Sequence, residues 1–222
     1  FDDMTDNFGF MQNHSMSVSG GSEKTVYRIG VGYTGEDGIL ITDKDSYDRL
    51  NLSTFMGVDV NSWLTTQLDL KYGNSKQKKV EAGGRNTVWV AAMNLPSYQN
   101  NEDYEENGTV YPAESPATYI RYGDPRRIKR NDLRALGRII LSPLKGLKIT
   151  GEYTYNRTTE QNKFYKNKYQ YIGMNFTGVL NSTENSSYAV TSKYTDYNAV
   201  NLFANYDMTF GKHDISVMGG YN

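Results

Sequence analysis

Apolar residues alternate with polar or small ones in the stretch LNLSTFMGVDV, which runs from Leu50 to Val60. Thr54 and Phe55 are the exceptions, one on each side of the alternation. Successive side chains of a β-strand point to opposite faces, whereas apolar residues of an amphipathic helix recur every three or four positions. The stretch therefore predicts a strand that has one apolar face and one wet face.

The same period of two recurs along the chain and predicts about eight strands. We expect them near residues 15–19, 27–33, 49–60, 64–72, 133–141, 147–155, 200–210 and 215–221. Short turns are expected at 20–23, 60–63, 142–146 and 211–213, and longer loops near 36–46, 78–130 and 160–193. Outer-membrane β-barrels have tight turns at one end and long loops at the other. The pattern therefore predicts an all-β, antiparallel sheet of this kind.

Composition narrows the class of protein further. The 222 residues include 19 Tyr and 21 Gly but no Cys, and only 37% are hydrophobic. The absence of Cys excludes disulfides and thiolate metal sites, and a net charge of −1 offers no basic stripe for nucleic acid. No apolar run reaches the length of about 18 residues that a membrane-spanning helix needs, whereas a barrel strand needs only about 9–11.

The longest predicted loop, 78–130, has features of its own. Val88, Ala91 and Ala92 recur near helical spacing, which predicts a short helix within 86–93. Loops of this length are uncommon in compact domains and usually carry function. Aromatic faces in this loop suit the stacking of a ligand, and they are the candidate substrate contacts: Trp89, Tyr98, Tyr104, Tyr111, Tyr119 and Tyr122. The alternative is that these rings pack the loop onto itself or onto a lid.

Three segments resemble the SusC/RagA branch of TonB-dependent outer-membrane transporters, found in Bacteroidetes. Residues 13–28, which continue into Gly32-Tyr33, are similar to the first barrel hairpin of that family. Residues 94–98, with 107–109, resemble its third-loop region, although Ser115-Pro116 stands where Asn-Pro is more usual. Residues 146–153 are similar to a strand opening of the family. The resemblance covers roughly residues 8–156.

The resemblance implies that residues 1–222 are part of the barrel domain of a larger transporter, in a 22-stranded barrel. The family's energy-coupling box, plug domain and terminal aromatic residue do not occur in these residues, so we expect an internal segment of a longer protein. The resemblance further implies active import of oligosaccharides or peptides across the outer membrane of a Gram-negative bacterium. A SusD-like surface lipoprotein would cover the barrel, TonB would supply energy through the plug, and lipid would surround the wall.

Charged residues gather on the predicted wet faces, where a hydrated lumen tolerates them and lipid does not. We hypothesise that four arginines anchor the plug or the substrate path: Arg28, Arg49, Arg134 and Arg138. The simpler alternative is that these charges are only solvated in a wet lumen.

No cofactor or metal is expected. The segment Asp43-Lys44-Asp45, with Asp48, resembles the start of a calcium loop but lacks the Gly at the sixth position and the Glu at the twelfth. A loop calcium is therefore left as an alternative. The two histidines, His14 and His213, lie far apart in the sequence. No Ser–His–Asp set, paired carboxylates or phosphate loop is evident, so we do not expect an enzyme.

Two other functions remain open. The chain could be a complete, small eight-stranded barrel that serves as an adhesin or structural protein, or a soluble glycan-binding β-sandwich. The importer interpretation requires that the apolar faces meet lipid. A structure in which these side chains pack against a second sheet or against helices would contradict it.

Overall fold

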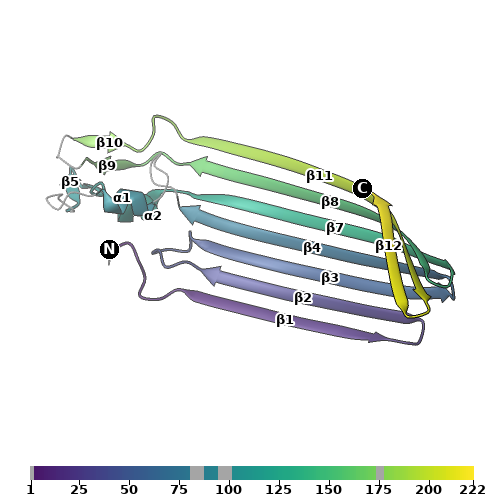
Figure 1. The fold of residues 1–222 in the computed structure, drawn as a ribbon. Helices are drawn as coiled ribbons and strands as arrows, with labels where there is room; N and C mark the ends of the chain where they lie inside the picture. The colour runs from purple at the N-terminus through teal and green to yellow at the C-terminus, as the bar shows by residue number, and fades with distance from the viewer. Residues whose placement is uncertain (1–2, 81–87, 95–101, 174–177) are drawn as a thin grey trace.

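The computed structural model describes residues 3–80, 88–94, 102–173 and 178–222. Eight strands form one antiparallel sheet in which each strand pairs with the next long strand along the chain (Figure 1). They are β1 (Phe10–Gly21), β2 (Thr25–Asp37), β3 (Ser46–Asn61), β4 (Leu64–Val80), β7 (Pro125–Leu144), β8 (Leu147–Lys166), β11 (Ser187–Phe210) and β12 (His213–Tyr221). The all-β antiparallel prediction is confirmed, and so are its eight strands and four short turns.

The strand register gathers the predicted apolar positions on one face of the sheet. Tyr27 pairs with Met56, and this row of neighbours continues through Leu68, Gly137 and Tyr153 to Val200 on β11. Directly paired residues have their side chains on the same face. Many of these side chains are exposed, for example Ile29 (54%) and Val200 (62%). The sheet therefore carries a broad, uncovered apolar face.

The strands run further toward the long-loop end than the sequence predicts. β4 continues to Val80, β7 begins at Pro125, and β8 continues to Lys166. The three long connections are therefore 38–45, 81–124 and 167–186, shorter than the predicted loops. In these extensions both faces are polar, so the period-two contrast disappears while the ladder of backbone hydrogen bonds continues.

Four short strands and two helices lie at the long-loop end of the sheet (Figure 1). β5 (Tyr104–Glu106) pairs with β6 (Thr109–Tyr111), and β9 (Gln170–Ile172) pairs with β10 (Val179–Asn181). The β5–β6 turn is Asn107-Gly108, and both residues have positive φ, as a two-residue type I′ hairpin requires. The helices are α1 (Val88–Met93) and α2 (Pro116–Tyr122). The predicted helix is thus confirmed from Val88, while 86–87 lie outside the described residues.

The two helices begin and end for local reasons, and neither could cross a membrane. Ser115 caps α2, because its side chain accepts a hydrogen bond from the Thr118 amide and Pro116 occupies the first helical position. None of the helices in the described part of the chain is long and apolar enough to span a bilayer.

The buried core lies at the long-loop end and not beneath the sheet. Ile120 of α2 is fully buried (0% exposed), and α1 contributes Val88 and Ala91. The full cluster is Met4, Leu40, Val80, Val88, Ala91, Ala117 and Ile120. Residues from the β2–β3 connection, the end of β4 and both helices thus bury one another, and we call this assembly the loop cap.

Lys44 fastens α2 to the β2–β3 connection. Its Nζ donates to the carbonyl oxygens of Ile120, Arg121 and Gly123, at 2.9, 2.6 and 2.9 Å. A helix leaves its last carbonyls without partners inside the helix, and a lysine ammonium has three N–H groups to offer. Burial lowers the pKa of Lys44, an effect that the charges of Asp124 and Asp43 oppose.

Replacing Lys44 with methionine is expected to loosen α2 without disturbing the sheet. The three carbonyls at the end of the helix lose their donor, which costs about 1–3 kcal/mol locally. Hydrogen exchange of the 116–122 amides should accelerate at least tenfold, while exchange in β3 and β4 should not change. Arginine at position 44 is the comparison, since it keeps the charge. Unaltered exchange at 116–122 in Lys44→Met would show that the cap does not depend on this contact.

Candidate functional site

The four predicted arginines lie on the polar face of the sheet. Arg28 in β2 lies in the row of Phe55 and Asp69, and Arg49 in β3 pairs with Ser75. Arg134 and Arg138 lie on β7, where they pair with Lys71 and Gln67 of β4. The structure thus brings all four onto the face opposite the apolar one, on β2, β3 and β7.

Arg138 belongs to a network that joins four strands. Its Nε donates to Glu152 Oε1 on β8, and its Nη1 donates to Gln67 Oε1 on β4 at 3.0 Å. Asn201 of β11 donates to the second oxygen of Glu152 at 3.2 Å. Both oxygens of this largely buried carboxylate are therefore bonded. The network fixes Arg138 in place, so this arginine is a less available ligand contact than its exposed neighbours.

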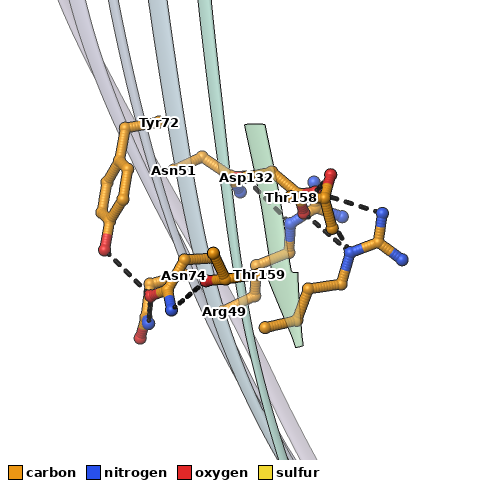
Figure 2. A network of polar contacts seen from close by, with 9 residues as sticks. Arg49, Asn51, Tyr72, Asn74, Asp132, Thr158 and Thr159 are labelled. Carbon is orange, nitrogen blue, oxygen red and sulfur yellow. Dashed lines mark hydrogen bonds and ion pairs between the residues drawn. The ribbon is translucent and has the colours of Figure 1, made fainter. Parts of the chain in front are cut away.

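A second polar network lies nearer the long-loop end and occupies both faces (Figure 2). On the polar face, Asp132 accepts hydrogen bonds from Arg130 and from Thr158, the latter at 2.7 Å, and Arg49 donates to Asn51 at 2.9 Å. These contacts hold charged groups at fixed positions along β3, β7 and β8.

On the opposite face, Tyr72 and Asn74 both donate to Asn131 Oδ1, and Asn131 donates in turn to Thr159 (Figure 2). Asn74, Asn131 and Thr159 lie in one row, one step beyond Tyr72 and Leu133. This row is where the apolar face gives way to polar residues on β4, β7 and β8. We call it the polar belt.

Two adjoining hollows lie on the polar face. The larger hollow, about 810 Å³, is lined by Arg28, Phe55, Asp69 and Lys71, among others. The second, about 350 Å³, is lined by Arg49, Lys71, Asp132 and Arg134. The two share Ser53 and Lys71 and therefore adjoin. A surface that carries four cations and two carboxylates can bind charged groups and polar groups such as peptide amides.

Tyrosines from two distant segments meet in the loop cap. Tyr122 of α2 stacks on Tyr169 with ring centroids 5.8 Å apart, and Tyr169 contacts Tyr171 of β9 at 6.0 Å. Tyr119 donates its hydroxyl to Glu114 Oε1 at 2.7 Å. Of the predicted substrate contacts, Tyr119 and Tyr122 are thus brought together. Tyr119 is packed within the cap, while Tyr122 remains exposed.

The ionisation of these tyrosines is suppressed. Burial raises the pKa of Tyr119 far above its usual value, with a further contribution from the hydrogen bond to Glu114. Burial and the nearby Tyr171 raise the pKa of Tyr169 to about 12. At physiological pH these rings therefore carry neutral hydroxyls, and the exposed Tyr122 of the same cluster offers an apolar face for stacking with a ligand.

The other predicted contacts are more scattered. Tyr104 and Tyr111 face each other across the β5–β6 hairpin, and Trp89 lies on α1 with a partly exposed side chain. β6 leads into Ala113, which forms a bridge with Ile172, the last residue of β9, so this hairpin adjoins the tyrosine cluster. Tyr98 lies outside the described residues.

Tyr169 and Tyr171 are not among the residues predicted from the sequence to contact a ligand. They belong to the 160–193 region, which shows no apolar period, and only their spacing of two residues within a Tyr-rich stretch could have indicated a strand. Their contact with α2 depends on how two separate loops meet, and no local pattern records it.

The segment that resembles a calcium loop has other partners. Lys44 binds α2, Asp43 Oδ2 lies 3.4 Å from Lys78 Nζ, and Asp48 accepts from the Tyr33 hydroxyl at 2.8 Å. Burial, together with the charge of Glu36, raises the pKa of Asp45. Within the described ranges, no group of three or more acidic or histidine side chains is close enough to hold a metal ion. A loop calcium stays an untested alternative.

Comparisons with known proteins give a match in structure only. Neither a family model nor a curated protein matches this chain. A solved structure of the RagAB peptide transporter matches with a TM-score of 0.74 and 18% identity, over 98% of this chain and 24% of that one. The open-open state of the RagAB peptide importer matches with a TM-score of 0.73 and 17% identity, over 95% of this chain and 23% of that one.

The closed-closed state of the RagAB importer matches less closely, with a TM-score of 0.58 and 15% identity over 95% of this chain. At these identities the likeness concerns the fold alone. The chain spans about a quarter of the length of the first two chains. Its antiparallel sheet and loops therefore have the fold of a segment of the RagAB transporter chains.

Proposed function

We propose that the chain forms part of the wall of an outer-membrane β-barrel that imports peptides or oligosaccharides into a Gram-negative bacterium. One observation carries the proposal: eight paired strands share an exposed apolar face opposite a charged one. Exposed apolar surface of this extent is unfavourable in water, whereas a barrel wall turns it toward lipid and its polar face toward an aqueous lumen.

The apolar band also crosses the sheet obliquely, as a tilted barrel wall requires. The band is centred near Gly30 on β2 and near Ala204 on β11, and the register places these centres about seven residues apart along the strands. That shift accumulates over five strand-to-strand steps. With about 3.3 Å per residue and about 4.8 Å between strands, a horizontal band implies a strand tilt of roughly 45°, close to that of outer-membrane barrels.

The two alternative functions fit the geometry less well. A soluble β-sandwich would bury the apolar face under a second sheet, but the buried core of the described residues lies in the loop cap. A closed eight-stranded barrel would pair β1 with β12. In the described part of the chain these two strands stand at opposite ends of the strand order, each paired on one side.

The finer parts of the proposal concern ligand and partners. The fold likeness to a peptide transporter supports peptides over oligosaccharides, and the polar face offers both charge signs for peptide termini and side chains. Tyr122, Tyr104, Tyr111 and Trp89 would make first contact with the ligand at the cap. A SusD-like lipoprotein would cover this end, a plug would engage the polar face near Arg28, Arg49 and Arg134, and TonB would supply energy. No catalytic role and no cofactor form part of the proposal.

Fractionation of cells that express the native protein tests this function. We expect the protein in the outer-membrane fraction, released only by detergent, at about 100 kDa, four times the 25.2 kDa of this chain. Deletion of its gene should reduce uptake of labelled oligopeptides at least tenfold, and uptake of free amino acids, which porins admit, is the control. A protein of 25 kDa that is soluble without detergent would support the β-sandwich instead. A protein of 25 kDa that is released from the membrane only by detergent would support the small eight-stranded barrel.

A further inference from the structure

Basic residues cluster on the apolar face of the sheet, just beyond the polar belt. Lys76 pairs with Lys129, and Arg127 lies between Lys78 on one side and Lys163 on the other. The register gives all five the face parity of Tyr72, Leu133 and Tyr155, so they continue the outer surface of the wall toward the long-loop end. We call Lys76, Lys78, Arg127, Lys129 and Lys163 the basic outer patch.

The patch is poorly neutralised by the chain itself. Like charges directly opposite each other on a sheet destabilise the pairing, and here they occur at Lys76–Lys129 and at Lys78–Arg127–Lys163. Asp43 pairs with Lys78 at 3.4 Å, and Asp48 lies across from Lys76 but accepts from Tyr33. Both carboxylates are on the β3 side. Among the described residues, no ion pair reaches Arg127, Lys129 or Lys163.

Another cation on the same face, Arg157, differs from the basic outer patch because its charge is paired within the sheet. Arg157 lies in the row of Leu133, at the edge of the apolar band, and it is bonded to Asp196 at 2.7 and 3.0 Å. Arg157 is thus paired with a carboxylate of the protein itself. Arg127, Lys129 and Lys163, on the long-loop side of the polar belt, have no such ion pair among the described residues and can bind an external anion.

The distance of the patch from the edge of the hydrocarbon layer indicates which anion it binds. Lys76 and Lys129 lie four residues beyond Tyr72 and Leu133, about 14 Å along the strand and about 10 Å along the membrane normal at the tilt derived above. Lys163 lies eight residues beyond Tyr155 on β8, about 27 Å along the strand and about 19 Å along the normal. The headgroup layer begins at the edge of the hydrocarbon and is about 5–8 Å deep in an ordinary leaflet. A flexible lysine side chain spans the remaining distance. The ammonium groups of Lys76 and Lys129 therefore reach the level of lipid phosphates, whereas that of Lys163 stands further from the hydrocarbon.

Resting on the proposed function for its membrane orientation, we propose that the basic outer patch binds the phosphate of an outer-leaflet lipid headgroup. The phosphate would lie between β4 and β7, where its charge offsets the opposed Lys76 and Lys129, and Lys163 would add its attraction from further out. The acyl chains of the lipid would lie along Leu133 and Leu70 of the apolar face. Each cation near an anionic surface contributes about a fivefold gain in binding.

The test compares two triple variants of the full-length, detergent-solubilised protein. Lys76, Lys129 and Lys163 are changed to Gln in one, and the exposed turn lysines Lys24, Lys145 and Lys212, at the other end of the sheet, are changed to Gln in the matched control. Native mass spectrometry measures binding of phosphorylated lipid A and of its dephosphorylated form. We expect the patch variant to bind the phosphorylated lipid about 10- to 100-fold more weakly, and the control to stay within twofold of the native protein.

Further arms separate the possible outcomes. Replacing the same three lysines with Arg should preserve binding of the phosphorylated lipid. If the triple Gln variant does not fold, the double variant Lys129→Gln, Lys163→Gln takes its place in the binding measurement. Equal binding by the patch variant and the control would overturn the proposal. So would inorganic phosphate that displaces the lipid at millimolar concentration, because the patch would then be a free-anion site. Fractionation is scored first: a protein absent from the outer membrane refutes the proposed function, whereas unchanged lipid binding in a protein that resides there refutes this inference alone.

Discussion

Arginine in place of Leu68 is expected to destabilise the folded protein in lipid. Leu68 lies midway along the apolar stretch of β4, flanked on the same face by Met56 and Gly137, and its side chain is 44% exposed. An arginine at the bilayer midplane costs a barrel about 2–4 kcal/mol, which shifts the unfolding equilibrium about 30- to 1,000-fold. Urea unfolding of the protein reconstituted in phospholipid vesicles, followed by tryptophan fluorescence, measures the change.

Leu136 provides a matched control for this substitution. It is a leucine on the polar face of β7, directly across from Asp69. Arginine at position 136 would stand in the hydrated face with a carboxylate nearby, so we expect the free energy of unfolding to change by less than about 1 kcal/mol. Equal effects of Leu68→Arg and Leu136→Arg would mean that the two faces meet the same solvent, and the membrane assignment would then be wrong.

Aspartate in place of Ile120 is expected to unfold the loop cap while the sheet stays intact. Ile120 has no exposed surface and packs with Val88, Ala91 and Ala117. An unpaired charge at this position costs about 3–5 kcal/mol. The hydrophobic cluster has only seven buried residues in the described part of the chain, so we expect this cost to exceed the free energy that keeps the loop cap folded. Hydrogen exchange in 88–93 and 116–122 should approach the rate of an unfolded peptide, and the affinity for an imported peptide should fall at least tenfold.

The control is Met93→Asp, which introduces the same charge into α1 at a side chain that is 70% exposed. It should leave both exchange and affinity within about twofold of the native protein, since exposed substitutions away from such clusters change little. The contrary outcome is that the Ile120→Asp protein shows fast hydrogen exchange in the loop cap and yet binds the peptide with native affinity. That result would mean that the loop cap does not contact the ligand, and the polar face would be the remaining candidate for the binding surface.

The sequence predicts the sheet well wherever its two faces meet different surroundings. Residues 50–60 and 200–210 alternate because one face is apolar and the other polar, and both were located correctly. The prediction fails along 156–166 and 187–199, where both faces carry polar residues. There the strands persist through backbone hydrogen bonds, which every residue except proline can make, so side-chain identity holds no record of them.

The candidate site shows the same division. The face of Arg28, Arg49, Arg134 and Arg138 follows from counting by twos along each strand, and the register bears it out. The role of Lys44 does not follow, because its three acceptors are backbone carbonyls that lie more than 70 residues further along the chain. Backbone atoms are the same in every residue, so a contact of this kind leaves no compositional trace.

The strict neighbour-to-neighbour order of the sheet bears on how such a wall could assemble. Every long strand pairs with its predecessor along the chain, and the helices and small hairpins lie outside this order. The wall can therefore grow by one strand at a time, each new strand pairing with the one before it. At every stage only the first and the newest strand keep unpaired backbone groups along their outer edges. A wide wall built this way never requires distant ends of the polypeptide to find each other before the final closure.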